Sequence, residues 1–427
     1  MDIQELYQIY LQHPVITTDS RQCPADSLFF ALKGESFDGN RFAQMALEKG
    51  CAYAIVDDAS LQGEHLILVK DVLETLQQLA AYHRQQLRIP VLQITGTNGK
   101  TTTKELVSAV LSKKFNTLYT QGNLNNHIGV PRTLLRITAE HEIAVIETGA
   151  NHPGEIEFLC RMVQADYGLI TNVGRAHLEG FGSFEGVKKT KGELYDSLAS
   201  RQKGCFLNMM DMDLFGMWAE RSSEGCQLLP YVQGVVLDCK PFVRLAWMHP
   251  VTTQRHEVQT QLIGSYNLPN LLAAITVGLH FGVPADDIDA ALSEYAPTNN
   301  RSEFRQTERN SLIVDAYNAN PTSMAAALDN FAMIEAKEKM VILGDMRELG
   351  AESQEEHRKI VDKLQQTNVE EVWFVGDNFR QVAPQNARCY SNVDEVKTEL
   401  TAHPLSGKTI LIKGSNGTKL FQLPELL

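Results

Sequence analysis

The chain has few of the features that mark secreted or membrane-spanning proteins. Its seven cysteines are odd in number and scattered, and no two of them have C-x-x-C spacing. The spacing therefore indicates neither a disulfide framework nor a cysteine zinc site, and we interpret the cysteines as reduced thiols. No stretch approaches the ~18 continuous apolar residues of a membrane helix, and no basic segment precedes an apolar run at the N-terminus. We expect a soluble, cytoplasmic protein.

Basic charge is also scarce. The chain has 39 Lys and Arg residues against 52 Asp and Glu residues, which gives a formal net charge of -13. Such a chain is not expected to wrap nucleic acid or to lie on an anionic membrane, so an anionic substrate would need local positive groups. At 427 residues, with 43% hydrophobic residues, the chain is also too long for one core, and we expect two or three domains.

Residues 1–88 have the pattern of a small α/β domain. Short apolar runs alternate with Gly, Asp and Ser turns and with one helical pattern. The runs are at 28–32, 51–56 and 65–69, and the helical pattern is at 42–49. A further helical pattern through Leu73, Leu76 and Leu79 leads to Pro90, where the proline predicts a break before the next strand.

Residues 89–297 begin as strand, glycine loop and helix. The run at 91–95 precedes a glycine turn, and the apolar positions of the helix at 101–113 fall on one face. Two short runs that fit buried parallel strands follow at 142–148 and 167–171. These features predict a nucleotide-type α/β domain. The mixed apolar pieces at 201–262 are interpreted as additional antiparallel strands.

Residues 298–427 repeat an alternation of strands and helices. Apolar runs lie at 312–316, 340–345, 371–377 and 409–414, and helical patterns lie at 321–336, 353–366 and 393–400. This alternation predicts a doubly wound parallel sheet, with loops at the carboxyl ends of its strands facing a ligand. The whole chain is thus expected to form three α/β domains in series.

The glycine loop between the strand at 91–95 and the next helix has the composition of a phosphate site. It consists of Gly96, Thr97, Asn98, Gly99, Lys100, Thr101 and Thr102. Backbone N–H groups would face phosphate oxygens, Lys100 would neutralise phosphate charge, and the Thr101 hydroxyl would bind magnesium. The loop is shorter than the ordinary G-x-x-x-x-G-K pattern, and a chance glycine turn beside a surface lysine is the alternative.

Two further residues follow apolar strands. Glu147 ends the run at 142–148, where a metal ion beside a nucleotide would account for a carboxylate, and a salt bridge or helix cap is the alternative. His177 follows the strand end at 171–172 and could bind a second cation, although an isolated loop histidine is more often incidental.

A series of ordered motifs resembles the Mur ligases across essentially the whole chain. The motifs are GTNGKTTTKE (96–105), GNLNNHIGVP (122–131), IETGAN (146–151), TNVGRAHLEGFGS (171–183), TKGELY (190–195), GSYNLPNLLAA (264–274), NRSE (300–303), DAYNANPTSM (315–324), LGDMRELG (343–350) and IKGSNGTKLF (412–421). The resemblance implies the three-domain Mur ligase architecture, with domains at 1–88, 89–297 and 298–427. The central domain would be a P-loop ATPase domain, and the C-terminal domain would be Rossmann-like.

The resemblance also implies roles for the residues around ATP. Asn267 and Asn270 would meet adenine, while Arg301 and Asp315 would meet the terminal phosphate and the ribose. Thr101 and Glu147 would serve one of two Mg²⁺ ions, and His177 the second. Lys191 would carry a carbamate beside the metal. The implied catalytic residues are Lys100, Glu147, His177, Lys191 and Arg301.

Each of these roles has an ordinary structural alternative. Asparagines at a helix start are usually caps. Arg301 and Asp315 could form a surface ion pair of little energetic value. Lys191 could be one solvated lysine of a basic cluster with Lys188 and Lys189.

The substrate contacts are implied less directly. Ser20 and Arg21, with the loop at 32–40, resemble the family's contacts to the UDP-sugar, and Asn125, Asn126 and His127 would help to hold it. The incoming dipeptide would meet four residues of the C-terminal domain, namely Tyr317, Asn318, Asn320 and Lys413. Ordinary polar turns are the alternative. A hinge near 297–300 would let the C-terminal domain complete the ATP site, in a protein expected to be a monomer.

The implied activity is ATP-dependent addition of D-alanyl-D-alanine to a UDP-N-acetylmuramoyl-tripeptide through an acyl phosphate, in cell-wall synthesis. A sibling ligase that adds a diamino acid is the nearest rival, but its D-N-P-R run is absent. A folylpolyglutamate-type ligase would leave the first domain unexplained. A nucleotide-dependent switch is the rival from another class, but the guanine-binding N-K-x-D is absent, and a switch would not need Glu147, His177, Lys191 and Arg301 together.

Overall fold

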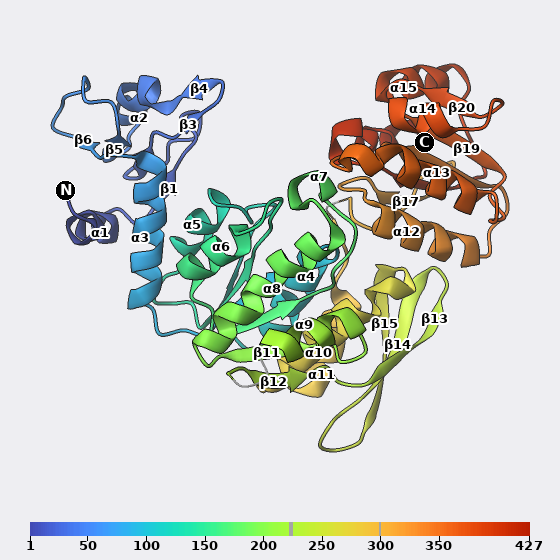
Figure 1. Cartoon of the computed structure of the whole chain (residues 1–427), viewed down its shortest axis with the longest axis horizontal. Helices are drawn as coiled ribbons and strands as arrows, with labels where there is room; N and C mark the ends of the chain where they lie inside the picture. The colour runs from blue at the N-terminus through green and yellow to red at the C-terminus, as the bar shows by residue number, and fades with distance from the viewer. Residues whose placement is uncertain (222–224, 299) are drawn as a thin grey trace.

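The computed structural model describes residues 1–221, 225–298 and 300–427, which form three sheet-containing domains in chain order (Figure 1). The N-terminal domain has a four-stranded parallel sheet of order β1-β2-β5-β6. Its elements are α1 (Ile3–Gln12), β1 (Ile16–Thr17), β2 (Leu28–Phe30), β3 (Lys33–Gly34), β4 (Phe37–Asp38), η1 (Gly39–Phe42), α2 (Ala43–Glu48), β5 (Tyr53–Val56), β6 (Leu66–Leu68) and α3 (Val72–Gln86).

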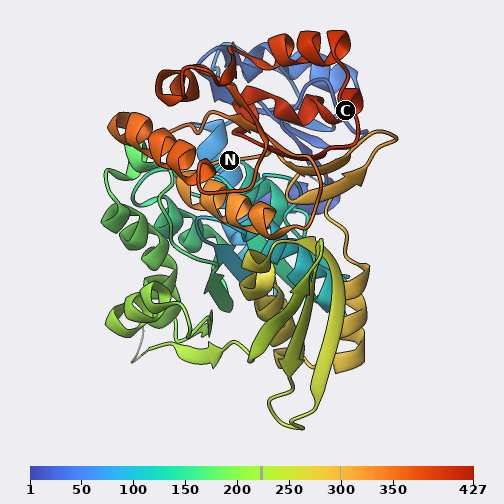
Figure 2. The same ribbon diagram turned by 90° about the vertical axis from the view of Figure 1, so that its right-hand side faces the viewer.

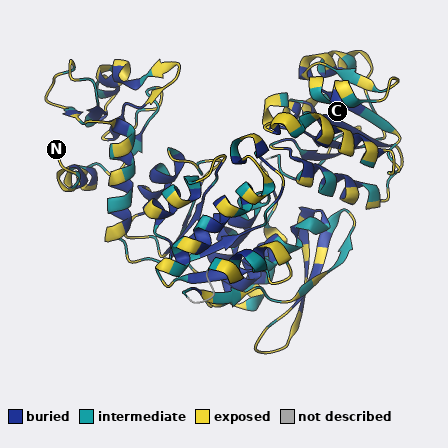
Figure 3. Cartoon of the chain, viewed as in Figure 1, coloured by how far each residue is buried: buried dark blue, intermediate teal, exposed yellow. Residues whose placement is uncertain are grey.

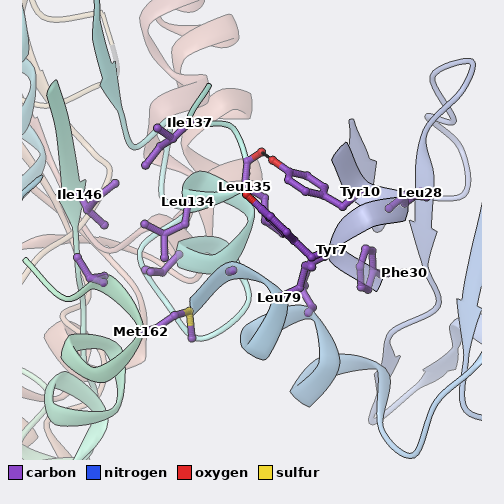
Figure 4. Close-up of a cluster of buried hydrophobic side chains, with 14 of the residues drawn as sticks. Tyr7, Tyr10, Leu28, Phe30, Leu79, Leu134, Leu135, Ile137, Ile146 and Met162 are labelled. Atoms are coloured by element: carbon purple, nitrogen blue, oxygen red, sulfur yellow. Dashed lines mark hydrogen bonds between the residues drawn. The ribbon is translucent and has the colours of Figure 1, made fainter. Parts of the chain in front are cut away.

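Helix α1 is absent from the sequence-based prediction. Its sequence does contain a start signal, because Asp2 and Glu5 form a reciprocal capping box. Helix α1 buries Leu6, Tyr7 and Tyr10. These side chains belong to one hydrophobic cluster that continues into the central domain through Leu134 and other residues (Figure 4).

The central domain is built on a six-stranded parallel sheet of order β12-β11-β10-β7-β9-β8. Its first elements are β7 (Val91–Thr95), α4 (Lys100–Leu111), β8 (Thr117–Tyr119), α5 (Gly129–Leu134), β9 (Ile143–Glu147), α6 (Glu155–Val163), β10 (Tyr167–Ile170), α7 (Leu178–Phe181) and α8 (Phe184–Ser200). Every residue of β7 and β9 is buried. Figure 3 shows buried residues, in dark blue, gathered in the interior of the central domain. Burial on both faces explains why these strands are continuous apolar runs.

The stretch at 201–262 was predicted as antiparallel strands, and this prediction is partly wrong. Its first half contains β11 (Gly204–Leu207), α9 (Met212–Arg221) and β12 (Gln227–Pro230), and both strands extend the parallel sheet. Residues 222–224 lie outside the described residues. The second half is antiparallel as expected, with β13 (Gly234–Cys239), β14 (Phe242–Met248) and β15 (Arg255–Ile263), and the β14–β15 turn projects at the bottom of Figure 2.

The C-terminal domain follows η2 (Ser265–Asn267), α10 (Leu268–His280) and α11 (Ala285–Glu294). Its sheet has the order β16-β17-β21-β18-β19-β20 and is parallel except for the edge strand β16, which confirms the predicted doubly wound arrangement. Its elements are β16 (Glu303–Gln306), β17 (Ser311–Asp315), α12 (Pro321–Met333), β18 (Lys339–Gly344), η3 (Gly350–Glu352), α13 (Ser353–Leu364), β19 (Glu371–Val375), α14 (Asp377–Val382), β20 (Arg388–Tyr390), α15 (Val393–Ala402) and β21 (Thr409–Lys413), followed by the short turns η4 (Asn416–Thr418), η5 (Leu420–Gln422) and η6 (Pro424–Leu426).

The boundaries between the domains stay predictions. The predicted hinge at 297–300 includes residue 299, which lies outside the described residues. Among the described residues, none of the helices is both long enough and apolar enough to cross a membrane.

Candidate active site

The glycine loop lies between β7 and α4, as predicted, and its conformation depends on two glycines. Gly96 has φ +144° and Gly99 has φ +77°, values that side chains rarely adopt. A Cβ atom on Gly96 would lie 2.0 Å from Thr171 Oγ1, so the loop also needs the missing side chain for space. Lys100 turns back over the loop, and its Nζ donates hydrogen bonds to the Gly96 and Thr97 carbonyls at 2.9 and 3.0 Å.

The segment after β10 fixes the glycine loop from the neighbouring strand. Thr171 Oγ1 and Asn172 Nδ2 donate to the Asn98 carbonyl at 2.6 and 2.9 Å, and the Asn98 N–H donates to Asn172 Oδ1 at 3.0 Å. The sequence analysis did not assign this role to Thr171 and Asn172. Strand β10 pairs with β7 in parallel, so the carboxyl ends of both strands lie at one edge of the sheet. The position of Thr171 and Asn172 after a predicted parallel strand was the signal that could have indicated this role.

Glu147 ends β9 beside the loop, where its carboxylate is only 1% exposed. Its Oε1 accepts hydrogen bonds from Asn125 Nδ2 at 2.8 Å and from Thr101 Oγ1 at 3.3 Å. Its Oε2 is buried and has no hydrogen-bond partner among the residues that the structure describes. A buried carboxylate oxygen without a partner is costly, so neither the salt bridge nor the helix cap considered for Glu147 describes its surroundings.

Lys191 lies on α8 and is 3% exposed, which contradicts the alternative of a solvated lysine. Within the described parts of the chain no carboxylate pairs with it, and its Nζ lies 5.5 Å from the centre of the Phe181 ring. Burial, and then repulsion from Lys100, lower the pKa of Lys191 to about 7. Burial likewise lowers the pKa of Lys100 to about 8, although Glu147 opposes this shift. Both lysines are therefore held where their charge is disfavoured.

His177 directly precedes α7 and has the left-handed backbone conformation, with φ +51°. Its Nδ1 contacts Glu348 Oε2 of the C-terminal domain, and this contact lowers the pKa of Glu348. A second ion pair between the same segments joins Arg175 and Glu352 at 3.2 Å. The sequence analysis missed Glu348, because nothing in the linear sequence places it near His177.

Asn267 and Asn270 are buried at the start of α10, beside the glycine loop. Asn267 makes no side-chain cap to α10, and its Nδ2 donates to the Ile263 carbonyl at 2.8 Å. Asn270 Nδ2 donates to Asn267 Oδ1 at 2.8 Å, and Thr103 Oγ1 of α4 donates to Asn270 Oδ1 at 3.0 Å. The two asparagines therefore connect the start of α10 to the phosphate-loop helix, so the cap interpretation is wrong for Asn267.

Arg301 and Asp315 of the C-terminal domain face the same space, but they do not pair with each other. Arg301 stacks on the Tyr317 ring at 3.8 Å. Asp315 pairs with Lys413 Nζ at 2.5 Å, and Lys413, which is 1% exposed, also donates to the Asn318 carbonyl at 3.3 Å. The alternative of an Arg301–Asp315 surface ion pair is therefore wrong.

A cavity of about 1100 Å³ lies between the central and C-terminal domains and collects most of the predicted residues. The predicted residues on its wall are Thr97, Asn98, Gly99, Lys100, Thr101, Thr102, Asn125, Asn126, His127, Glu147, His177, Asn267, Asn270, Arg301, Asp315, Tyr317, Asn318 and Lys413. Five others are not part of the wall, namely Ser20, Arg21, Gly96, Lys191 and Asn320. Arg21 has a side chain that is 87% exposed and pairs with Asp19 at 2.8 Å.

The fold and this cavity define a class: a three-domain enzyme whose central domain carries a phosphate loop and whose C-terminal domain supplies further charges. Family models match along the chain as the Mur ligase family, catalytic domain (14–93), the Mur ligase middle domain (94–278) and the Mur ligase, glutamate ligase domain (300–416). The chain belongs to the Mur ligase family.

Individual relatives cover nearly the full length. The UDP-N-acetylmuramoyl-tripeptide--D-alanyl-D-alanine ligase of Bacillus subtilis is 34% identical, over 96% of this chain and 92% of the relative. The protein of the same name from Escherichia coli is 33% identical over 96% and 93%. A crystal structure of MurF from Acinetobacter baumannii has a TM-score of 0.86 and 30% identity, and covers 99% of this chain and 97% of that one.

Proposed function

We propose that this chain is an ATP-dependent ligase that joins D-alanyl-D-alanine to UDP-N-acetylmuramoyl-tripeptide, giving the pentapeptide precursor of peptidoglycan. The observation that carries the proposal is the near full-length similarity to ligases of this name. The cavity supports the proposed reaction, because the phosphate loop, a buried carboxylate and cations of the C-terminal domain all line it.

ATP is held from both domains in this proposal. The loop N–H groups and Lys100 bind the β- and γ-phosphates at the N-terminus of α4, where the helix dipole favours negative charge. Asn267 and Asn270 would contact adenine, Asp315 would meet the ribose, and Arg301 would meet the terminal phosphate. Positioning and charge stabilisation supply most of the catalysis in phosphoryl transfer.

Residues beside the loop fit a magnesium site. Glu147 Oε2 is buried and has no partner in the described parts of the chain, and the Thr101 hydroxyl lies 3.3 Å from Oε1 of the same carboxylate. Carboxylate and hydroxyl oxygens are the ligands that Mg²⁺ prefers. When bound, Mg²⁺ neutralises phosphate charge as it develops. His177 would serve a second ion, and its contact with Glu348 through Nδ1 would leave Nε2 for that role.

Carbamylation of Lys191 is part of the same proposal. A neutral lysine amine combines with carbon dioxide to give a carbamate and a proton. Lys191 is buried and has no carboxylate partner within the described residues, so its surroundings favour a neutral amine over a cation. The carbamate would replace that cation by an anion.

The reaction follows in two steps. The terminal carboxylate of the tripeptide attacks the γ-phosphorus, which forms an acyl phosphate and releases ADP. The neutral amine of D-alanyl-D-alanine then attacks the acyl carbon, which forms the amide and releases phosphate and a proton. In this proposal Asn125, Asn126 and His127 would contact the UDP-sugar, as would Ser20 and Arg21 of the N-terminal domain. Tyr317, Asn318 and Lys413 line the cavity and would contact the incoming dipeptide.

The test is phosphate release from Mg·ATP by purified protein, with UDP-N-acetylmuramoyl-tripeptide present and D-alanyl-D-alanine either supplied or omitted. Release that needs both substrates and gives the UDP-linked pentapeptide is the expected result. Release with UDP-N-acetylmuramoyl-dipeptide and a diamino acid would assign the chain to the preceding step instead. No release with any acceptor would favour a nucleotide-binding module. The cytoplasmic location and the monomeric state stay predictions.

A further inference from the structure

An amide–amide pair joins the phosphate loop to the C-terminal domain. Asn320 Nδ2 donates to Asn98 Oδ1 at 2.7 Å, and Asn98 Nδ2 donates to Asn320 Oδ1 at 3.4 Å. The two residues are 222 positions apart in the chain, and Asn320 is 4% exposed. Because Asn320 is buried, its amide would carry a desolvation cost if it were left without its partner.

The backbone of Asn98 is already committed to the central domain. Thr171 and Asn172 occupy its carbonyl and its N–H through three hydrogen bonds. Because these bonds fix the Asn98 backbone, they also set the direction of the Asn98 side chain, which points toward Asn320 of the C-terminal domain. Any change in the loop that moves the Asn98 backbone must also move the amide that Asn320 meets.

Asn320 is also fixed, as the N-cap of the 13-residue helix α12. Its Oδ1 accepts from the Ser323 N–H at 2.9 Å, and its own N–H donates to Ser323 Oγ at 3.1 Å. Thr322 and Ser323, in the first turn of α12, line the cavity. The two domains approach closely here, because a Cβ on Gly174 would lie 3.1 Å from Thr322 Oγ1.

We propose that the Asn98–Asn320 pair couples the conformation of the phosphate loop to the docking of the C-terminal domain. Asn320 is then a positioning residue that sets the start of α12 over the loop, and not a contact to the incoming dipeptide. The inference rests on the proposed function only in that the cavity binds a nucleotide. Because coupling between two equilibria is reciprocal, docking tightens nucleotide binding as much as the nucleotide favours docking.

A double-mutant cycle with Asn98→Ala and Asn320→Ser tests the coupling. Serine caps helices about as well as asparagine, so Asn320→Ser keeps the cap while its shorter side chain loses the bridge. The measurement is the dissociation constant of Mg·ADP by titration calorimetry, with the radius of gyration in solution as a second readout. We expect each single variant to weaken Mg·ADP about tenfold, and the double variant to be no weaker than either.

Asn392→Ser is the matched control, because Asn392 caps α15 in the same domain and has no contact with the phosphate loop. Its Mg·ADP affinity should equal that of the unmodified protein. If the effects of Asn98→Ala and Asn320→Ser on the Mg·ADP dissociation constant multiplied in the double variant, the inference would be overturned. An Asn320→Ser variant in which only the KM for D-alanyl-D-alanine changed would also overturn it. Because Mg·ADP binding needs no turnover, the double-mutant cycle tests the coupling even if the ligase assay shows no activity. The failure of the proposed function and the failure of the coupling can therefore be distinguished.

Discussion

At the scale of single residues, the site contains charged side chains whose surroundings in the protein do not stabilise their charge. A bound ligand would supply the missing interactions. Within the described residues, one carboxylate oxygen of Glu147 has no hydrogen-bond partner and buried Lys191 pairs with no carboxylate. Burial also lowers the pKa of Lys100 to about 8. Such groups usually destabilise a folded chain, so they are candidates for function. Two substitutions test Lys100 and Glu147 separately.

Lys100→Met should lower kcat/KM for ATP about a thousandfold. A lysine ~4 Å from a phosphate charge contributes on the order of 4 kcal/mol at an effective dielectric near 20. Steady-state kinetics with saturating UDP-N-acetylmuramoyl-tripeptide and D-alanyl-D-alanine checks the value. Lys113→Met is the control, because Lys113 pairs at the surface with Glu294 and should matter little. If the Lys100→Met enzyme kept more than about a tenth of normal activity, Lys100 would not be a phosphate-binding residue.

Glu147→Gln should raise the Mg²⁺ concentration needed for half-maximal activity at least about tenfold. The amide oxygen can still accept from Asn125 and Thr101, so thermal stability should stay the same or rise as the buried charge is lost. Activity is measured over a Mg²⁺ titration, alongside thermal unfolding. Glu142→Gln, at an exposed position before the same strand, should leave both unchanged. A normal Mg²⁺ requirement with a lower melting temperature would indicate a structural role for Glu147.

At the scale of elements, the short phosphate loop depends on packing against the segment that follows β10. Gly96 is held against Thr171, while Asn98 receives hydrogen bonds from Thr171 and Asn172. The loop is therefore preorganised by a neighbouring strand of the sheet, and its shape depends on contacts as well as on its glycines.

Gly96→Ala should weaken Mg·ADP binding at least about thirtyfold while the domains stay folded. The added Cβ would overlap Thr171 Oγ1, and φ +144° disfavours alanine, so the loop must shift by several tenths of an ångström or more. Calorimetric titration measures the affinity. Gly216→Ala is the control, because Gly216 lies inside α9 with open space around it, and alanine should add about 0.5–1 kcal/mol of helix stability there. Normal Mg·ADP affinity in Gly96→Ala would contradict this account of the loop.

At the scale of the whole molecule, the N-terminal and central domains share one hydrophobic core. Tyr10 of α1 reaches the Leu135 carbonyl of the central domain at 2.6 Å, and Figure 4 shows both within this cluster. His83 of α3 contributes a second link, because its Nε2 lies 2.8 Å from the Ile137 carbonyl and its Nδ1 lies 3.1 Å from the Tyr7 hydroxyl. The central and C-terminal domains meet around the cavity, and Ile263 and Phe242 of the antiparallel strands also pack against the hydrophobic core of the C-terminal domain.

Acid should weaken the joint between the N-terminal and central domains through His83. Burial lowers the pKa of His83 below its ordinary value of 6.5, although the Ile137 carbonyl opposes the shift. As pH falls through the ordinary value, the unfolded chain takes up a proton that folded His83 resists, so stability is full above that pH and decreases below it. The contribution is on the order of 1 kcal/mol per pKa unit.

Thermal unfolding at about pH 7.5 and about pH 5.5 measures this effect. His83→Gln should lose less stability between the two pH values than the unmodified protein, and the exposed His403→Gln should behave like the unmodified protein. Equal losses in all three proteins would show that His83 does not carry the dependence.

The sequence by itself determined the class of fold and the phosphate site. Buried parallel strands are continuous apolar runs, so β7, β9, β18 and β21 were found close to their observed bounds. The glycine loop was found because its residues act locally, between one strand and one helix. The ordered motifs identified the family, which the comparisons confirm.

Tertiary structure alone decided which distant residues meet. The sheet order placed β11 and β12 in the central parallel sheet, although their sequences looked like the antiparallel strands that follow. Asn320 hydrogen-bonds to Asn98, a contact that the sequence did not predict, and its predicted role as a dipeptide contact stays a prediction. Glu348 was not predicted at all. Contacts between domains depend on the packing of whole units, and neither periodicity nor local spacing encodes that packing.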